Sequence, residues 1–303
     1  DNQSHWLFDS FLFLEIMDTG TGGANKMFAK GYNLESANQA DWTKLIDYYF
    51  QSETGIGALD ASVKEASAIL GTPRQKRQIV ISIPEPIVYQ HPEQASSSTK
   101  YWGKIDNQTL DFSNSADRIK ACKWYIDQVR AKFNEKNYQH VELAGFYWLA
   151  EKATDTRDIL NAVAIYLNKL KYSFNWIPYY GADGYNQWKS LGFNYAYFQP
   201  NYFFNESVPD SRLEDACQKA LTYDMHMELE FDDNALNSRG KAYRLKNYMS
   251  AFKKHGIWEK KRLAYYQGSA SLLTLKKSGN AADTQLYHEF CNFVISRPIR
   301  SSH

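Results

Sequence analysis

The feature that most constrains the fold is the alternation of short apolar runs with amphipathic stretches. The first run, residues 6–16, is almost continuously hydrophobic, as expected for a strand covered on both faces. Six similar runs follow, at 78–83, 141–149, 173–178, 193–199, 224–231 and 262–266. Strands that alternate with helices are typical of a parallel sheet built from βα units. No linker interrupts the 303 residues, so we expect one α/β domain over residues 1–303, a TIM (β/α)8-type barrel.

Seven strands are one fewer than a closed eightfold barrel requires. The missing strand either precedes Asp1 in the natural protein or lies within residues 41–70. The second alternative is weak, because residues 41–50 and 58–70 have helical patterns. If the missing strand comes first, the seven runs are strands two to eight of the barrel.

The stretches between the runs have the periodicity and the ends of helices. One apolar stripe begins near residues 113–115 and recurs at steps of three and four residues, at Ile119, Cys122, Ile126, Val129 and Phe133. Ser211 and Glu214 have the spacing of a capping box at the start of another helix. Two long connections, 17–40 and 84–115, follow strands, which places them at the face where barrel enzymes bind their substrates.

Composition excludes several classes of function. The net charge of +1 lacks the basic surplus of a nucleic-acid-binding protein, and no apolar run is long enough to span a membrane. The histidines never have metal-ligand spacing, residues 20–26 lack the spacing of a phosphate loop, and no G-x-S-x-G elbow occurs. We therefore expect no metal and no other cofactor, with a metal assembled across distant loops as the alternative left open. Aromatic residues make up 16% of the chain, which fits either a sugar-binding cleft or a densely packed aromatic core.

Carboxylates at the ends of two strands are the candidate catalytic groups. Glu151 follows the apolar run 141–149 directly, at the end of strand four on the inferred numbering. In the run 224–231, period-two alternation puts Met227 and Leu229 on one face and Glu228 and Glu230 on the other. Because the apolar face packs against helices, the acidic face points into the barrel. Burial of two carboxylates is costly and more often serves chemistry than packing, although an internal salt bridge of Glu228 is the alternative.

Further polar and aromatic side chains fall at or just beyond strand ends, where they could line a substrate cleft. These candidate binding residues are Glu15, Tyr147, Trp148, Tyr180, Asp183, Gln199, Asn201, Tyr202, Asp232, Tyr266 and Gln267. For each one taken singly, a surface or core position is the more common role. Their shared location is what points to a site.

Three segments carry a resemblance to a known family. They are the run 6–15, the motif Gly145-Phe146-Tyr147-Trp148 with Glu151, and the motifs 179–185 and 193–203. The sequence resembles the bacterial family named domain of unknown function 4855 over almost its whole length. The resemblance implies a glycoside-hydrolase-type TIM barrel with a further strand upstream, and an exported protein. Glutamates at the ends of strands four and seven are also similar to those of the largest clan of retaining glycosidases.

These observations support a glycoside hydrolase acting on an oligosaccharide or polysaccharide. In this hypothesis Glu151 is the general acid/base, Glu230 is the nucleophile, and Glu228 tunes Glu230 or orients a sugar hydroxyl. Which of Glu228 and Glu230 is the nucleophile stays open, as do the sugar, the linkage and the oligomeric state. One alternative is a barrel that binds carbohydrate without cleaving it. Another is a structural module of a larger surface protein.

Overall fold

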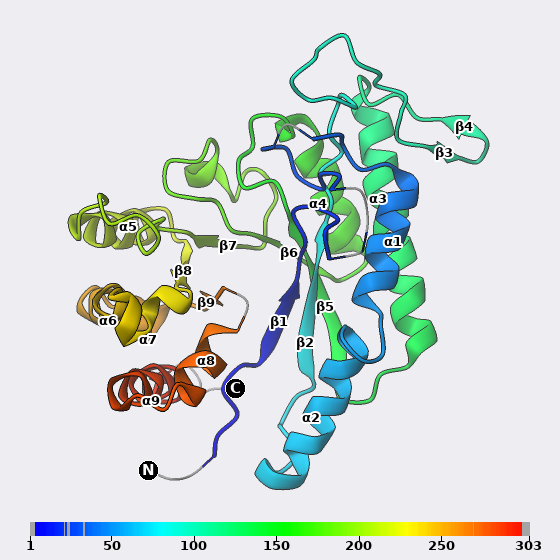
Figure 1. Cartoon of the computed structure of the whole chain (residues 1–303). Coiled ribbons are helices and arrows are strands. Elements are labelled where there is room, and N and C mark those ends of the chain that lie inside the picture. The colour runs from blue at the N-terminus through cyan, green and yellow to red at the C-terminus, as the bar shows by residue number, and fades with distance from the viewer. Residues whose placement is uncertain (1–3, 21, 23–24, 33, 269, 299–303) are drawn as a thin grey trace. The chain divides into compact units, whose positions relative to one another are not determined.

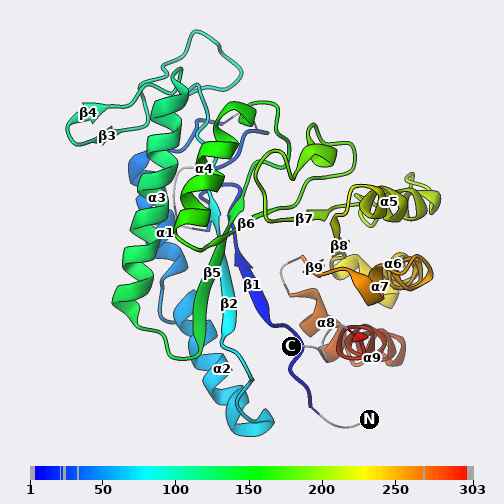
Figure 2. The same ribbon diagram turned by 180° about the vertical axis from the view of Figure 1, so that it is seen from behind.

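The computed structural model describes residues 4–20, 22, 25–32, 34–268 and 270–298. The chain divides into two compact units, shown from opposite sides in Figures 1 and 2. The first unit consists of Asp1–Trp176 and Trp188–Asn194, and the second of Ile177–Gln187 and Tyr195–His303. Whether residues 1–303 act as one domain, as the sequence predicts, stays a prediction.

The first unit is built on four parallel strands that adjoin in chain order. The strands are β1 (Ser10–Phe13), β2 (Arg77–Ile83), β5 (Val141–Trp148) and β6 (Ser173–Trp176). Four helices lie along one side of this sheet, α1 (Gln39–Tyr49), α2 (Ile56–Leu70), α3 (Ser115–Lys136) and α4 (Arg157–Lys169) (Figure 1). The strands β3 (Lys104–Ile105) and β4 (Gln108–Thr109) form a small antiparallel hairpin within the connection after β2.

Aromatic side chains fill much of the interior of the first unit. Trp42 on α1 packs edge-on against Trp102, with 5.1 Å between the ring centroids, and against Tyr125 on α3 at 5.7 Å. Trp148 and Trp176, at the ends of β5 and β6, are also completely buried. Much of the aromatic excess therefore belongs to a packed core, one of the two interpretations that the composition left open.

The second unit has three parallel strands, again adjoining in chain order. They are β7 (Tyr195–Phe198), β8 (His226–Glu230) and β9 (Leu263–Tyr266). The helices of this unit are α5 (Ser211–Thr222), α6 (Ala242–Lys254), α7 (Ile257–Lys260), α8 (Ser271–Lys277) and α9 (Ala281–Ile295). Three short 3₁₀ turns complete it, η1 (Tyr185–Gln187), η2 (Asp233–Ala235) and η3 (Asn237–Arg239).

The predicted α/β class is confirmed, because parallel strands alternate with helices in both units. The main strands described are the seven that the sequence predicts. Residues 41–49 and 58–70 lie in α1 and α2, so the alternative of a strand hidden in that region is wrong. None of the described helices is long and apolar enough to cross a membrane.

Two local predictions differ from the structure. The first strand spans only Ser10–Phe13 of the predicted run 6–16. Trp6, instead of extending the strand, donates its indole N–H to the Gly71 carbonyl and stacks under Arg77. The predicted capping box is wrong, since Asp210 is the N-cap residue of α5 and Glu214 pairs with Lys254. The lysine offers Glu214 a charged partner in place of a backbone N–H.

Candidate functional site

The strand β8 presents its two glutamates on one face, as the alternation predicts. Met227 and Leu229 are completely buried on the other face. Glu228 and Glu230 are also buried, with 7% and 0% of their surfaces exposed. Opposite them on β9, Glu228 pairs with Ala264 and Glu230 with Tyr266. Both predicted catalytic positions of the second unit are therefore interior carboxyl groups.

Glu230 is held by neutral hydrogen-bond donors. Gln199 donates its side-chain N–H to Oε1 at 3.0 Å, and the backbone N–H of Asn201 donates to Oε2 at 2.9 Å. The Tyr248 hydroxyl on α6 donates to the same Oε2, and the backbone N–H of Tyr202 adds a further bond. Burial raises the pKa of Glu230, and these donors act in the opposite direction. Among the described residues no lysine or arginine forms an ion pair with Glu230.

The backbone beyond β7 is shaped to receive this carboxylate. Asn201 has a left-handed conformation, with φ of 51°. Consecutive N–H groups around such a residue converge on one point and form a concave anion site. The carboxylate of Glu230 occupies that point, and the Gln199 amide also donates to Oδ1 of Asn201 at 3.0 Å. The structure thus brings Gln199, Asn201 and Glu230 into direct contact.

Three predicted binding residues lie at the end of β9 or after β8: Tyr266, Asp232 and Gln267. Tyr266 is 47% exposed, and its pKa is raised by partial burial and then by the nearby Glu228, Asp232 and Glu230 carboxylates. Asp232 caps the η2 turn by accepting from the Asn234 backbone N–H at 2.7 Å. Gln267 accepts from the backbone N–H of Leu272 at the start of α8. Only Tyr266 of these three presents an extensive surface to a ligand.

Tyr180, Asp183 and Tyr202 do not form one cluster with Glu230 in the way the sequence suggested. Tyr180 donates its hydroxyl to Asp215, and the Arg212 guanidinium lies 3.9 Å from its ring centroid. Tyr202 has a completely buried side chain whose hydroxyl donates to Asp210, so only its backbone faces Glu230. Asp183 is exposed in the loop between β6 and β7.

In the first unit, the aromatic residues predicted to line the cleft lie mainly in the core. Tyr147 and Trp148 are buried, and the Trp148 indole N–H donates to the Thr156 hydroxyl at 3.3 Å. Glu151 is half-buried in the turn that follows β5. Because Glu151 belongs to the first unit and Glu230 to the second, the pairing of these two carboxylates stays a prediction.

Glu85 is a candidate that the sequence analysis missed. It follows β2 within Pro84-Glu85-Pro86, and it is buried, with 5% of its surface exposed. Oε2 accepts from the Lys30 backbone N–H at 2.7 Å. Burial, and secondarily Asp155, raise the pKa of Glu85 to about 7, while the Lys30 N–H and the charges of Lys30 and Lys152 oppose the rise. An acidic residue directly after an apolar strand, the signal used for Glu151, would have found it.

Three neighbouring strands of the first unit therefore carry carboxylates just beyond their C-terminal ends. Glu15 follows β1, Glu85 follows β2 and Glu151 follows β5, and these strands adjoin in that order. A carboxyl group that holds a proton near neutral pH can act as a general acid, and an ionised one as a base or nucleophile. These strand ends supply groups suited to acid and base chemistry.

The comparisons with known proteins identify the family. Among solved structures, a family 18 chitinase from Crocus vernus is similar, with 11% identity, 77% of each chain covered and a TM-score of 0.43. The catalytic domain of a family GH18 chitinase from the fern Peteris ryukyuensis gives 12% identity, coverage of 77% of this chain and 78% of that one, and a TM-score of 0.42. No curated protein sequence matches the chain. The family model described as "Domain of unknown function (DUF4855)" matches residues 1–292, so the chain belongs to that family.

Proposed function

We propose that this protein is a glycoside hydrolase that cleaves an oligosaccharide or polysaccharide with two carboxyl groups. The proposal rests mainly on the environment of the Glu230 carboxyl group. It is a buried acid at the end of a parallel strand, its pKa is raised, and its hydrogen-bond donors within the described part of the chain are neutral. Such a group is costly to the folded state, and perturbed carboxyl groups of this kind cluster at functional sites.

In the proposed reaction Glu151 is the general acid/base and Glu230 the nucleophile. Glu151 protonates the glycosidic oxygen while the Glu230 carboxylate attacks the anomeric carbon, which releases the leaving sugar as an alcohol and forms a glycosyl ester. The ionised Glu151 then takes a proton from water, which hydrolyses the ester with overall retention. Glu228 tunes Glu230 in this scheme. Glu228 is 7% exposed and Glu230 is not exposed at all. The alternative assignment, with Glu228 as the nucleophile and Glu230 as the residue that tunes it, should therefore also be tested.

The test is a screen of the purified protein against plant, host and bacterial glycans, with new reducing ends as the readout. We expect turnover by the wild type. In Glu151→Gln and Glu230→Gln the rate of cleavage should fall about 10²–10⁴-fold, with glycan binding retained. Glu65→Gln on the exposed side of α2 makes the same chemical change away from the strand ends and keeps full activity. A wild type that cleaves none of the glycans contradicts the proposal.

A second candidate is a barrel that binds carbohydrate without cleaving it. The burial of Glu230 favours this alternative, because both of its carboxylate oxygens already accept hydrogen bonds from the chain itself. In that case Glu230 is an anchor for the 199–202 segment, and exposed side chains such as Tyr266 contact the sugar. Glycan binding by a wild type that is inert in the screen supports this alternative.

A further inference from the structure

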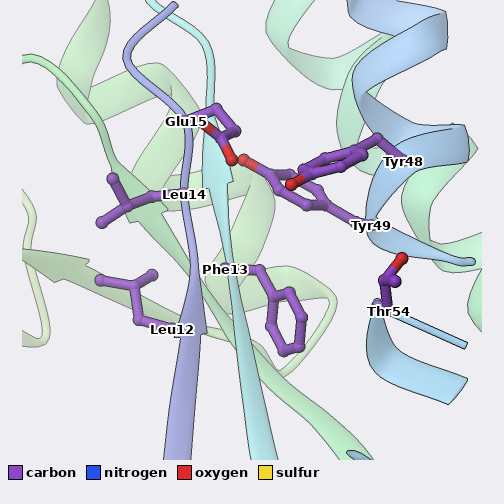
Figure 3. A pocket seen from close by; sticks show the side chains of 8 residues that line it. Leu12, Phe13, Leu14, Glu15, Tyr48, Tyr49 and Thr54 are labelled. Atoms are coloured by element: carbon purple, nitrogen blue, oxygen red, sulfur yellow. The ribbon is translucent and has the colours of Figure 1, made fainter. Parts of the chain in front are cut away.

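The first unit contains a pocket of about 160 Å³ at the end of β1 (Figure 3). It lies between the strand, the C-terminal end of α1 and the turn that leads into α2. The residues that line it are Leu12, Phe13, Leu14, Glu15, Tyr48, Tyr49, Thr54 and Gly55. Cavities of about 150 Å³ hold a ring the size of benzene, so this pocket has room for a ligand of one small ring.

Aromatic side chains give the pocket fixed walls. Phe13 and Tyr49 pack edge-on with 6.0 Å between their ring centroids, and Tyr48 and Tyr49 are 6.1 Å apart. Tyr49 is almost completely buried, and its hydroxyl lies 3.1 Å from Oγ of Ser82 on β2. In Figure 3 the hydroxyl ends of both tyrosines point toward Glu15. The pocket therefore joins an aromatic surface to one polar end.

Glu15 supplies the charge at that polar end. Its side chain is half-buried and accepts a hydrogen bond from the Tyr48 hydroxyl. Burial raises the pKa of Glu15, and the hydrogen bond from Tyr48 opposes the rise. Among the described residues no lysine, arginine or histidine forms an ion pair with it. The pocket thus contains a partly desolvated carboxylate that is not paired with any cationic side chain of the residues the structure describes.

Gly20 lies close to Glu15 and Tyr48. A Cβ atom at this position would lie 3.0 Å from Oε1 of Glu15 and 3.0 Å from the Tyr48 hydroxyl oxygen. The backbone at Gly20 therefore lies so near the carboxylate that a larger residue would crowd it. This approach removes water from one side of Glu15 and makes a charged ligand group the more favourable partner.

We propose that this pocket binds a small organic cation, a protonated amine carried on a ring of about six atoms. The ammonium group donates to Glu15, and the ring lies against Phe13, Tyr48 and Tyr49, whose aromatic surfaces also favour a cation. A metal ion is less suitable, because no group of three acidic, histidine or cysteine ligands occurs in the described part of the chain. This inference does not depend on the proposed glycosidase activity.

The experiment compares two probes of nearly equal size on the whole chain, cyclohexylammonium and cyclohexanol, by NMR-monitored titration. We expect the wild type to bind the cation at least about tenfold more tightly than the neutral alcohol, the value of one hydrogen bond to a charged group. This comparison needs no variant. Equal affinity for the two probes, or binding of neither, overturns the proposal.

Two variants locate the effect. Glu15→Gln keeps the shape of the side chain and removes the charge, so it should bind cyclohexylammonium about tenfold more weakly, while Glu65→Gln should bind it like the wild type. Tyr48→Phe removes the hydroxyl that donates to Glu15 and keeps the aromatic wall, so cation binding should persist. Unchanged affinity in a folded Glu15→Gln protein, or loss in Glu65→Gln, contradicts the assignment.

Discussion

Nε2 of Gln199 lies 3.0 Å from Oε1 of Glu230 and donates a hydrogen bond to it. This bond joins the end of β7 to the end of β8. Together with the N–H groups of Asn201 and Tyr202, it fixes the left-handed turn that follows β7. Glu230 is therefore an anchor for the segment 199–202 as well as a candidate for catalysis, and the two roles make separate predictions.

The Tyr248 hydroxyl is one of the donors that compensate for the burial of Glu230. Tyr248→Phe removes it and leaves a carboxylate oxygen with less compensation, so the free energy of unfolding at pH 8 should fall by about 1–3 kcal/mol. Tyr243→Phe on the same helix is the control, because Tyr243 is exposed and should change stability little. Urea unfolding measures both. Equal stability of Tyr248→Phe and the wild type would show that this bond contributes nothing.

Glu85 should make the protein less stable as the pH rises above 4.5, the ordinary pKa of a glutamate. Its pKa is 4.5 in the unfolded chain and about 7 in the folded one, so between these values the folded state binds more protons. The contribution of Glu85 to the free energy of unfolding is therefore fully present below pH 4.5 and is lost as the pH rises to about 7. The wild type should lose about 3 kcal/mol relative to Glu85→Gln between pH 4.5 and pH 8. Parallel pH dependences of the two proteins in urea unfolding would contradict this.

His226 makes the protein less stable as the pH falls, which is the opposite of the effect of Glu85. Burial, and then the charges of Arg262 and Lys261, lower its pKa to about 4, and its Nδ1 accepts from the Arg262 backbone N–H at 3.2 Å. Between pH 6.5 and 4 the unfolded chain binds the proton and the folded one does not, so stability falls as the pH falls through this range.

His226→Asn keeps an acceptor at a similar position and does not titrate. We expect the wild type to lose about 3 kcal/mol relative to this variant between pH 7 and pH 4. His288→Asn changes an exposed histidine and serves as the control. Chemical unfolding at both pH values gives the difference, and a constant offset between wild type and His226→Asn would refute the assignment.

Gly145 on β5 lies directly opposite Ser173 on β6. A Cβ atom there would lie 2.0 Å from Oγ and 2.6 Å from the carbonyl oxygen of Ser173, so the strands would have to separate. Gly145→Ala should lower the free energy of unfolding by about 3 kcal/mol or more. Gly31→Ala, where no atom lies within 4 Å of the added Cβ, should have little effect. Thermal or urea unfolding compares the two, and similar stabilities would show that the strands adapt.

Periodic patterns in the sequence predict the helices and the buried strand faces correctly. The stripe from Ile119 to Phe133 predicts a helix, and α3 spans Ser115–Lys136. The alternation in β8 predicts that Glu228 and Glu230 share one face, and both are buried together. Such patterns follow from the geometry of one element against one core, so they need no knowledge of distant residues.

Side-chain partners from distant segments were not predictable in the same way. Tyr248 lies on α6 and reaches Glu230 only because α6 packs beside β8, and Lys254 diverts Glu214 from the predicted capping box. Trp148 and Tyr202 fall near strand ends in the sequence, yet tertiary packing buries both rings. Position along a strand therefore indicates candidates for the site, and packing decides which of them a ligand can reach.

The most direct test of the proposed function measures turnover and binding of the same glycan by the wild type and Glu151→Gln. We expect Glu151→Gln to bind the glycan with unchanged affinity and to cleave it about 10²–10⁴-fold more slowly, while Glu65→Gln should cleave it at the wild-type rate. Cleavage by Glu151→Gln at the wild-type rate would contradict the two-carboxylate mechanism with Glu151 as its acid.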